Sequence, residues 1–296
     1  MGWTVRKKRI VAAALAVLLC LAVAGGWWWR HITSPAYRTR QAVAEIRAAM
    51  VDPNLARTDN AGGPPNWLAR MSDPEWVLRQ LGARAVPHLI EIIRSKDPYT
   101  CAAAGKGLCA AARGEDDIGP LLLPALADAD AEVRRAAAEA LGNTGAIDGR
   151  MVKALAEALG DEDRRVGTAA MEVLRGHLLR GHGGTVLPLA VRAARDRRPS
   201  ARWNAALILG TASRRGSRVV PDLVRLLGDP HRNVRYAAAE ALGNMGPAAR
   251  SAEGALRRAA EDENSYVREA AVEALKRLRG RPTSAAAATT RPDGRQ

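Results

Sequence analysis

The chain has 296 residues, of which 47% are hydrophobic and 26% charged, and its formal net charge is +14. This composition fits a folded body with additional segments and excludes a chain that is disordered throughout. The three cysteines, Cys20, Cys101 and Cys109, give no disulfide framework, because Cys101 and Cys109 would lie about 12 Å apart on one helix.

The N-terminal segment is first basic and then apolar. Residues 1–9 end in four consecutive basic side chains, and residues 10–29 carry no charge and end in three tryptophans. Twenty helical residues span about 30 Å, the thickness of a bilayer core, and tryptophan is enriched at membrane interfaces. We therefore expect a single transmembrane signal-anchor at 10–29. The basic residues 1–9 should then lie in the cytoplasm, with the remainder on the outer, periplasmic side of a bacterial inner membrane.

A cleaved signal peptide is the alternative for this segment. Ala22-Val23-Ala24 provides an A-x-A site after a basic and an apolar region, and cleavage there would give a secreted protein. The tryptophans at 27–29 favour the anchor, because they suit an interface. A lipoprotein is not expected, since Leu19 stands where a small residue should precede Cys20.

Residues 30–72 and 281–296 flank the expected folded body. Ser34-Pro35 predicts the start of a juxtamembrane helix that runs to about Met50. Asp52–Trp67, which contains glycines and prolines, predicts a flexible spacer. The Ala/Thr/Pro-rich tail at 281–296 predicts disorder.

Residues 73–280 contain an internal repeat. Glu132–Gly145 reads EVRRAAAEALGNTG, and Asn233–Gly246 reads NVRYAAAEALGNMG. A marker leucine recurs every 33 or 35 residues, at Leu108, Leu141, Leu174, Leu209, Leu242 and Leu275. Within a unit the apolar residues fall at i, i+3, i+4, i+7 and i+8, which is one face of an α-helix.

A second predicted helix precedes each of these, and the two form a hairpin. Prolines suit its first turn, at Pro87, Pro120, Pro188 and Pro221. Glycines are expected as left-handed C-caps at Gly142, Gly145, Gly243 and Gly246. Because each short hairpin leaves an apolar stripe uncovered, the units must stack. The sequence therefore predicts an all-α solenoid of about six stacked hairpins at 73–280, preceded by the N-terminal transmembrane helix.

These motifs resemble HEAT-like repeats of the phycocyanobilin lyase type. The resemblance rests on VPxL at Val86–Leu89 and Val220–Leu223, on the turn aspartate, on the Val-Arg pair and on the EALGNxG ending, and it covers about residues 83–278. It implies a scaffold that binds other molecules, since HEAT-like solenoids mostly do so. The lyases of this type also imply, as an alternative, a lyase-like enzyme or an accessory subunit.

No catalytic, cofactor or metal site is predicted, and the protein is not expected to be an enzyme. None of the five histidines pairs with Cys, Asp or Glu at metal-ligand spacing. His177 and His182 predict a polar loop, with a chelating pair as the alternative. Gly181–Gly184 lacks the residues of a phosphate loop, and neither Ser200 nor Ser217 stands in a nucleophile motif.

Recurring charges predict structure. The turn aspartates should cap the next helix, and the arginines after the valine should pair with an aspartate of the neighbouring unit. The residues of this set are Asp128, Arg134, Asp229, Arg235, Asp262 and Arg268.

The fourth unit predicts a docking surface. Only there do two large apolar residues, Trp203 and Leu207, lie off the buried stripe, with Tyr236 on the next layer. Arginines surround them, at Arg198, Arg202 and Arg235, and such a patch is typical of a binding hot spot. The alternative is that Trp203 packs beneath Gly181–Gly184. Asn204 replaces a buried alanine and should bind a neighbouring backbone group.

The resulting hypothesis is a membrane-anchored, non-catalytic scaffold that binds a protein with an acidic surface. Membrane contact would come from residues 10–29, and no small-molecule substrate or cofactor is inferred. The alternative is binding of a polyanion through the arginines between 192 and 218. An outward-facing body disfavours nucleic acid as that polyanion and leaves anionic lipid.

Overall fold

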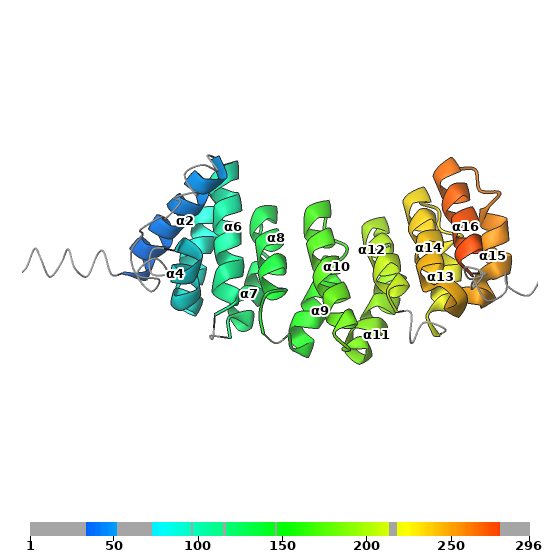
Figure 1. The fold of residues 1–296 in the computed structure, drawn as a ribbon, viewed down its shortest axis with the longest axis horizontal. Helices are drawn as coiled ribbons and strands as arrows, with labels where there is room; N and C mark the ends of the chain where they lie inside the picture. The colour runs from blue at the N-terminus through cyan, green and yellow to red at the C-terminus, as the bar shows by residue number, and fades with distance from the viewer. Residues whose placement is uncertain are drawn as a thin grey trace, which may run out of the picture. The chain divides into compact units, whose positions relative to one another are not determined.

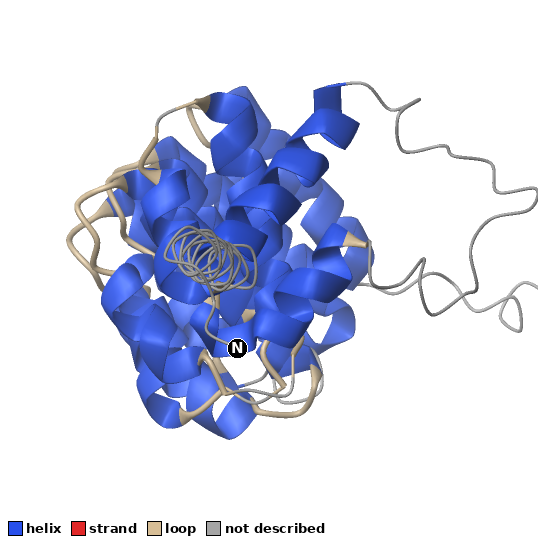
Figure 2. Cartoon of the chain, turned by 90° about the vertical axis from the view of Figure 1, so that its left-hand side faces the viewer, coloured by secondary structure: helices blue, strands red, loops and turns tan. Residues whose placement is uncertain are grey.

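The computed structural model describes residues 34–51, 73–95, 97–114, 117–145, 147–212 and 218–278. These residues form helices and turns and no strand, which confirms the predicted all-α fold for the described part of the sequence (Figure 2). The predicted span at 10–29, the spacer at 52–67 and the tail at 281–296 lie outside it. Among the described helices, none is both long enough and apolar enough to cross a bilayer.

The chain divides into two compact units, residues 1–118 and 119–296. The helices of the first unit are α2 (Pro35–Val51), α4 (Pro74–Leu81), η1 (Gly82–Arg84), α5 (Val86–Ile93) and α6 (Pro98–Ala112). The helix α2, which the sequence places outside the repeats, packs on α4 and α6 through Ala42, Val43 and Ile46. This helix is therefore part of the folded first unit.

The second unit contains five successive hairpins. Their helices are α7 (Gly119–Ala125), α8 (Ala131–Leu141), α9 (Gly149–Ala158), α10 (Arg164–Leu179), α11 (Gly183–Ala193), α12 (Pro199–Gly210), α13 (Val220–Leu226), α14 (Arg232–Met245), η3 (Gly246–Ala252), α15 (Glu253–Ala259) and α16 (Ser265–Leu278). The helices α8, α10, α12, α14 and α16 contact one another in order and form one row, the second-helix row (Figure 1). The first helices of the same hairpins form a second layer beside this row (Figure 1). They are α7, α9, α11, α13 and α15.

Small and branched apolar residues build the core between these layers. Val133, Ala137 and Leu141 on α8 are completely buried, and their counterparts on α14 are equally inaccessible. Alanine lets neighbouring helices approach closely, while valine and leucine fill the remaining space. The stripe seen in the sequence is therefore the contact between hairpins.

The glycines near the helix ends serve two purposes. Gly246 ends α14 with a positive φ of 56°, which favours glycine, but its ψ of −133° lies outside the left-handed helical region of the expected cap. In contrast, Gly142 has a right-handed φ of −65°, and Gly243 lies inside α14, so neither is the left-handed cap expected from the sequence. A Cβ on Gly243 would lie 3.0 Å from the Cα of Ala274, so this glycine is needed for close approach of α16.

Candidate docking site

Arginines link the hairpins through a ladder of paired charges. Arg134 donates two hydrogen bonds of 2.9 Å to the carboxylate of Asp161 in the next hairpin. The third guanidinium nitrogen of Arg134 donates to the carbonyl of Asp128 at 2.8 Å, in the turn of its own hairpin. The same arrangement recurs at Arg202 and Arg235, each of which binds the aspartate 27 residues later. The sequence pattern predicts the inter-repeat pairs of Arg134 and Arg235, and the pair of Arg202 adds a third.

Charge pairing overcomes the effect of burial on the aspartates of the ladder. Burial alone would raise the pKa of Asp229, but hydrogen bonds from the Arg202 side chain and the His231 backbone N–H lower the pKa below its ordinary value. The pKa of Asp262 follows the same balance: burial would raise it, but the hydrogen bond from the Arg235 side chain lowers it below its ordinary value. Both carboxylates therefore stay ionised and hold the layers together.

The ladder is interrupted between α10 and α12. Gly167 occupies the position where the other hairpins carry the ladder arginine. Arg198 reaches back from the next hairpin instead: it binds Asp196 at 3.0 Å, and its guanidinium lies so close to Gly160 that a Cβ there would collide with it. The hydrogen bond between the two side chains lowers the pKa of Asp196 and raises that of Arg198.

Asn204 crosses the same interruption. Its Nδ2 donates to the carbonyl of Leu159 at 2.7 Å, which is the backbone contact expected from the sequence. A Cβ on Gly167 would lie 2.9 Å from this nitrogen, so the glycine makes room for the amide. The glycine in place of the ladder arginine and the asparagine in place of the repeat alanine are therefore linked, because Gly167 leaves room for the side chain of Asn204.

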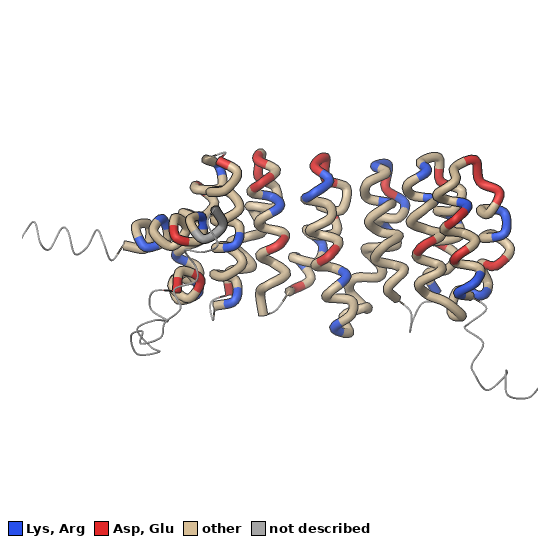
Figure 3. Tube along the Cα trace, turned by 45° about the horizontal axis from the view of Figure 1, so that its top comes forward, with Lys and Arg blue, Asp and Glu red and all other residues tan. Residues whose placement is uncertain are grey.

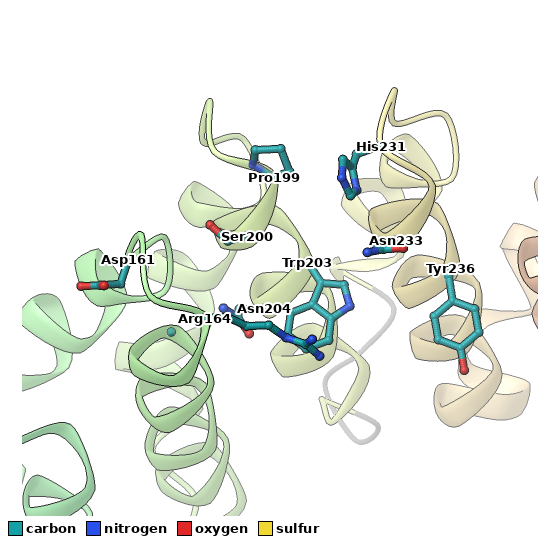
Figure 4. Close-up of a pocket in the computed structure, with 10 residues that line it drawn as sticks. Asp161, Arg164, Pro199, Ser200, Trp203, Asn204, His231, Asn233 and Tyr236 are labelled. Atoms are coloured by element: carbon teal, nitrogen blue, oxygen red, sulfur yellow. The ribbon is translucent and has the colours of Figure 1, made fainter. Parts of the chain in front are cut away.

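A pocket of about 410 Å³ opens at this interruption (Figure 4). Its lining comes from the N-terminal parts of α10, α12 and α14 and the turns before them: Asp161, Arg164, Gly167, Pro199, Ser200, Trp203, Asn204, His231, Asn233 and Tyr236. The guanidinium carbon of Arg164 lies 5.4 Å from the centroid of the Trp203 ring, within the range of a cation–π contact. A second pocket of about 300 Å³ adjoins it and shares Asn233 and Tyr236.

The structure brings together two of the residues predicted to dock a partner. Trp203 and Tyr236 line the pocket, whereas Leu207 is half-buried and does not line it. The alternative packing of Trp203 beneath the α10–α11 connection is not observed. Trp203 lies beside Arg164 at the start of α10, whereas Gly181–Gly184 follow the other end of that helix.

The predicted arginine contacts need correction. The side chains of Arg202 and Arg235 are only 11% and 10% exposed and are bound in the ladder. Arg198 is bound to Asp196. We therefore assign these three arginines a structural role in place of the docking role, because a charged run in the sequence does not reveal which of its members already have partners.

The sequence reasoning missed Arg164, His231 and Asn233 as parts of the site. A signal for the change at His231 was present in the repeat itself, three positions before the buried valine. Two earlier hairpins carry aspartate there, at Asp130 and Asp163, and this hairpin carries a histidine.

The two histidines near the end of α10 stack on each other. The rings of His177 and His182 have centroids 4.1 Å apart and an interplanar angle of 7°. Burial, followed by the charges of His182 and Arg180, lowers the pKa of His177 below its ordinary value. Within the described ranges, no group of three or more His, Cys, Asp or Glu side chains is placed to hold a metal ion.

Comparison with known proteins identifies the repeats. The family model for HEAT repeats matches residues 86–175 and 186–276, more than half of the sequence. No curated protein matches. Among solved structures, a designed armadillo repeat protein in complex with the peptide (KR)4 is 18% identical, with a TM-score of 0.41 and coverage of 65% of this chain and 98% of that one. Human deoxyhypusine hydroxylase in complex with glycerol is 24% identical, with a TM-score of 0.35 and coverage of 82% and 98%.

Proposed function

This chain belongs to the HEAT-repeat family, and on that premise we propose that it is a scaffold that binds a polypeptide segment of another protein in the pocket at Trp203. The observation that carries the proposal is that Trp203 and Tyr236, from successive layers, line one pocket. The phycocyanobilin lyase type of repeat stays a prediction from the sequence.

The shape and lining of the pocket support a polypeptide ligand. Its volume of about 410 Å³ lies within the range of binding pockets. Trp203, Tyr236 and Pro199 offer apolar surface, and aromatic residues in such pockets tend to dominate the energy of protein interfaces. The adjoining pocket behind Tyr236 continues the surface onto α16 through Tyr266. A ligand that occupies both pockets must be elongated, as an extended segment is.

The proposed scaffold is attached to a membrane through residues 10–29. The support is the length of the uncharged run, its tryptophans and the basic residues before it. Attachment with the repeats on the outer side would hold the bound protein at the membrane surface. Cleavage after Ala24 and secretion remains the alternative.

The ion pairs in the structure weaken the alternative hypothesis that the arginines between 192 and 218 bind a polyanion. Among the arginines of the basic run, Arg195 binds Asp222, Arg198 binds Asp196 and Arg202 binds Asp229. Figure 3 shows basic and acidic positions interspersed over the described second unit. Counterion release, which drives polyanion binding, needs arginines without such partners.

The test selects peptides with free C-termini from a displayed random library on the full-length protein in detergent micelles. The dissociation constants of the recovered peptides are then measured with the wild type, with Trp203→Ala and with Tyr99→Ala. Tyr99 is a matched control, because it is an aromatic residue 53% exposed on α6 of the first unit.

We expect Trp203→Ala to weaken binding at least tenfold, since a buried aromatic contact at an interface contributes about 2 kcal/mol or more. Tyr99→Ala should bind like the wild type, and the helical circular dichroism of both variants should be unchanged. Equal affinity of wild type and Trp203→Ala for every recovered peptide, or recovery of no peptide, would overturn the proposal.

A further inference from the structure

Most helices of the second-helix row begin with a capping side chain. In α8 and α10, Asp130 and Asp163 accept hydrogen bonds of 2.8 Å from the N–H two residues later. Before α16, Asn264 does the same at 3.1 Å. These caps satisfy N–H groups that have no partner within the helix.

The two helices that form the centre of the pocket lack such a cap. The equivalent residue is Arg198 before α12 and His231 before α14, and among the described residues no side chain caps the first turn of either helix. The N–H groups that correspond to the capped ones belong to Ser200 and Asn233. Both residues line the pocket, so both uncapped helix ends open onto it.

A buried acceptor without a donor lies one helical turn beyond Ser200. Asn204 is 2% exposed and lines the same pocket. Its Nδ2 is bound to Leu159, but its Oδ1 has no hydrogen-bond partner among the described residues. Buried acceptors are nearly always paired in proteins, so this oxygen points to a donor supplied by a ligand.

The charges around these groups favour an anionic ligand. A helix N-terminus carries about half a positive charge. Arg164 is exposed at one end of the pocket and Arg232 at the other, where the adjoining pocket begins. The one carboxylate in the described lining, that of Asp161, is bound by Arg134. The described lining therefore has no unpaired carboxylate that would repel an anionic ligand.

We propose, on the basis of the docking role above, that the pocket recognises an acidic residue of the bound polypeptide. The carboxylate accepts a hydrogen bond from the Ser200 N–H, and the backbone N–H of the same ligand residue donates to Oδ1 of Asn204. The ligand then supplies the cap that Asp130 and Asp163 supply in their own helices. An Asp or Glu side group and the carboxyl terminus of a polypeptide share this chemistry.

The repeat geometry extends the motif to a second acidic residue. Packed neighbouring helices lie about 8–10 Å apart, which separates the Ser200 and Asn233 N–H groups by one layer. Three residues of a polyproline II segment cover about 9 Å. A second carboxylate three positions along the ligand would therefore reach the Asn233 N–H.

Two pairs of substitutions separate capping from charge. The double variant Arg198→Asn/His231→Asn places a capping amide at both helix starts, as Asn264 does for α16. The double variant Arg198→Gln/His231→Gln removes the same side chains, including the Arg198–Asp196 pair, but glutamine is not a favoured cap. Both are compared as full-length proteins with the library-selected peptides.

We expect the Asn pair to bind at least tenfold more weakly than the Gln pair, because only asparagine occupies the N–H groups that the ligand needs. Its thermal unfolding temperature should also be the higher of the two. Equal affinities of the Asn and Gln pairs would overturn the inference.

Changes in the peptides identify the carboxylate. Replacing a required Asp or Glu by Asn or Gln should weaken binding to the wild type about tenfold and have little effect on the Asn pair. The same result on C-terminal amidation would identify the carboxyl terminus as the source. Peptides that need Trp203 but no carboxylate would overturn this inference and leave the docking role intact, whereas peptides indifferent to Trp203→Ala would remove the docking role itself.

Discussion

Single arginines join neighbouring hairpins because each one satisfies polar groups on both sides of a layer boundary. Spacing alone predicts the pairing of Arg134 and Arg235 with an aspartate of the neighbouring hairpin. It does not predict the same pairing of Arg202, which was expected at the docking surface. It does not predict the exception at Gly167, where the guanidinium comes from Arg198 of the following hairpin. Such a substitution depends on the path of a side chain in three dimensions, which the repeat pattern does not record.

Removal of one ladder arginine should destabilise the second unit. Arg235→Met leaves the carboxylate of Asp262 and the carbonyl of Asp229 without their donor in a largely buried place. We expect the free energy of unfolding at pH 7 to fall by about 3 kcal/mol, as for other broken buried ion pairs. Urea denaturation followed by circular dichroism measures this change.

Arg268→Met is the matched control, because Arg268 is exposed and donates to the carbonyls of Asp262 and Glu263. Its cost should stay below about 1 kcal/mol. Similar losses in the two variants would contradict a special role for the buried guanidinium.

The stacked histidines should make stability depend on pH. Burial lowers the pKa of His177 below 6.5. As the pH falls, this imidazole is therefore protonated in the unfolded protein before it is protonated in the folded protein. The contribution of His177 is therefore complete above pH 6.5 and is lost as the pH falls below that value. His177→Gln should flatten the unfolding temperature between about pH 5 and 7, measured by circular dichroism. His88→Gln, which alters a histidine of the first unit, should keep the wild-type slope.

At the level of the helices, the period of the repeat predicts the positions of the hairpins. It does not predict how each helix is capped. The helix pairs from α5/α6 to α15/α16 appear where the marker leucines place them. Gly142 and Gly243 are not the expected caps, because glycine suits close packing as well as a left-handed turn: Gly142 makes room for the side chain of Val173, and Gly243 for the backbone of Ala274. The pocket also arose from a local departure, the exchange of Asp for Arg198 and His231 at helix starts.

Close approach of α12 and α14 makes Gly210 sensitive to the smallest side chain. A Cβ on Gly210 would lie 2.8 Å from the Cα of Ala241, and backbone does not move aside as the end of a flexible side chain does. Gly210→Ala should therefore lower the free energy of unfolding by about 1–3 kcal/mol in urea denaturation. In contrast, Gly254→Ala on α15 meets no atom within 4 Å and should be neutral or stabilising by up to about 1 kcal/mol. The same sign for both substitutions would show that packing does not decide the outcome.

For the whole molecule, the prediction of membrane attachment rests on the uneven distribution of charged and apolar residues along the sequence. Five of the basic residues lie in the first thirty positions, around an apolar run that the described structure does not include. The repeats carry the proposed docking pocket, and the proposed anchor would decide where that pocket meets its partner. The two parts therefore make separate predictions.

Removal of residues 1–33 should release the protein from membranes without affecting the repeats. The uncharged run at 10–29 is the only stretch of the sequence long and apolar enough to span a bilayer core of about 30 Å. We expect the full-length protein to stay in the membrane fraction after carbonate extraction, and the shortened protein to appear in the supernatant with unchanged helical circular dichroism. Mass spectrometry of the full-length product separates the alternatives, because an intact N-terminus supports the anchor and a mature protein that begins at Gly25 supports cleavage and secretion. A full-length, uncleaved protein found in the supernatant would contradict both.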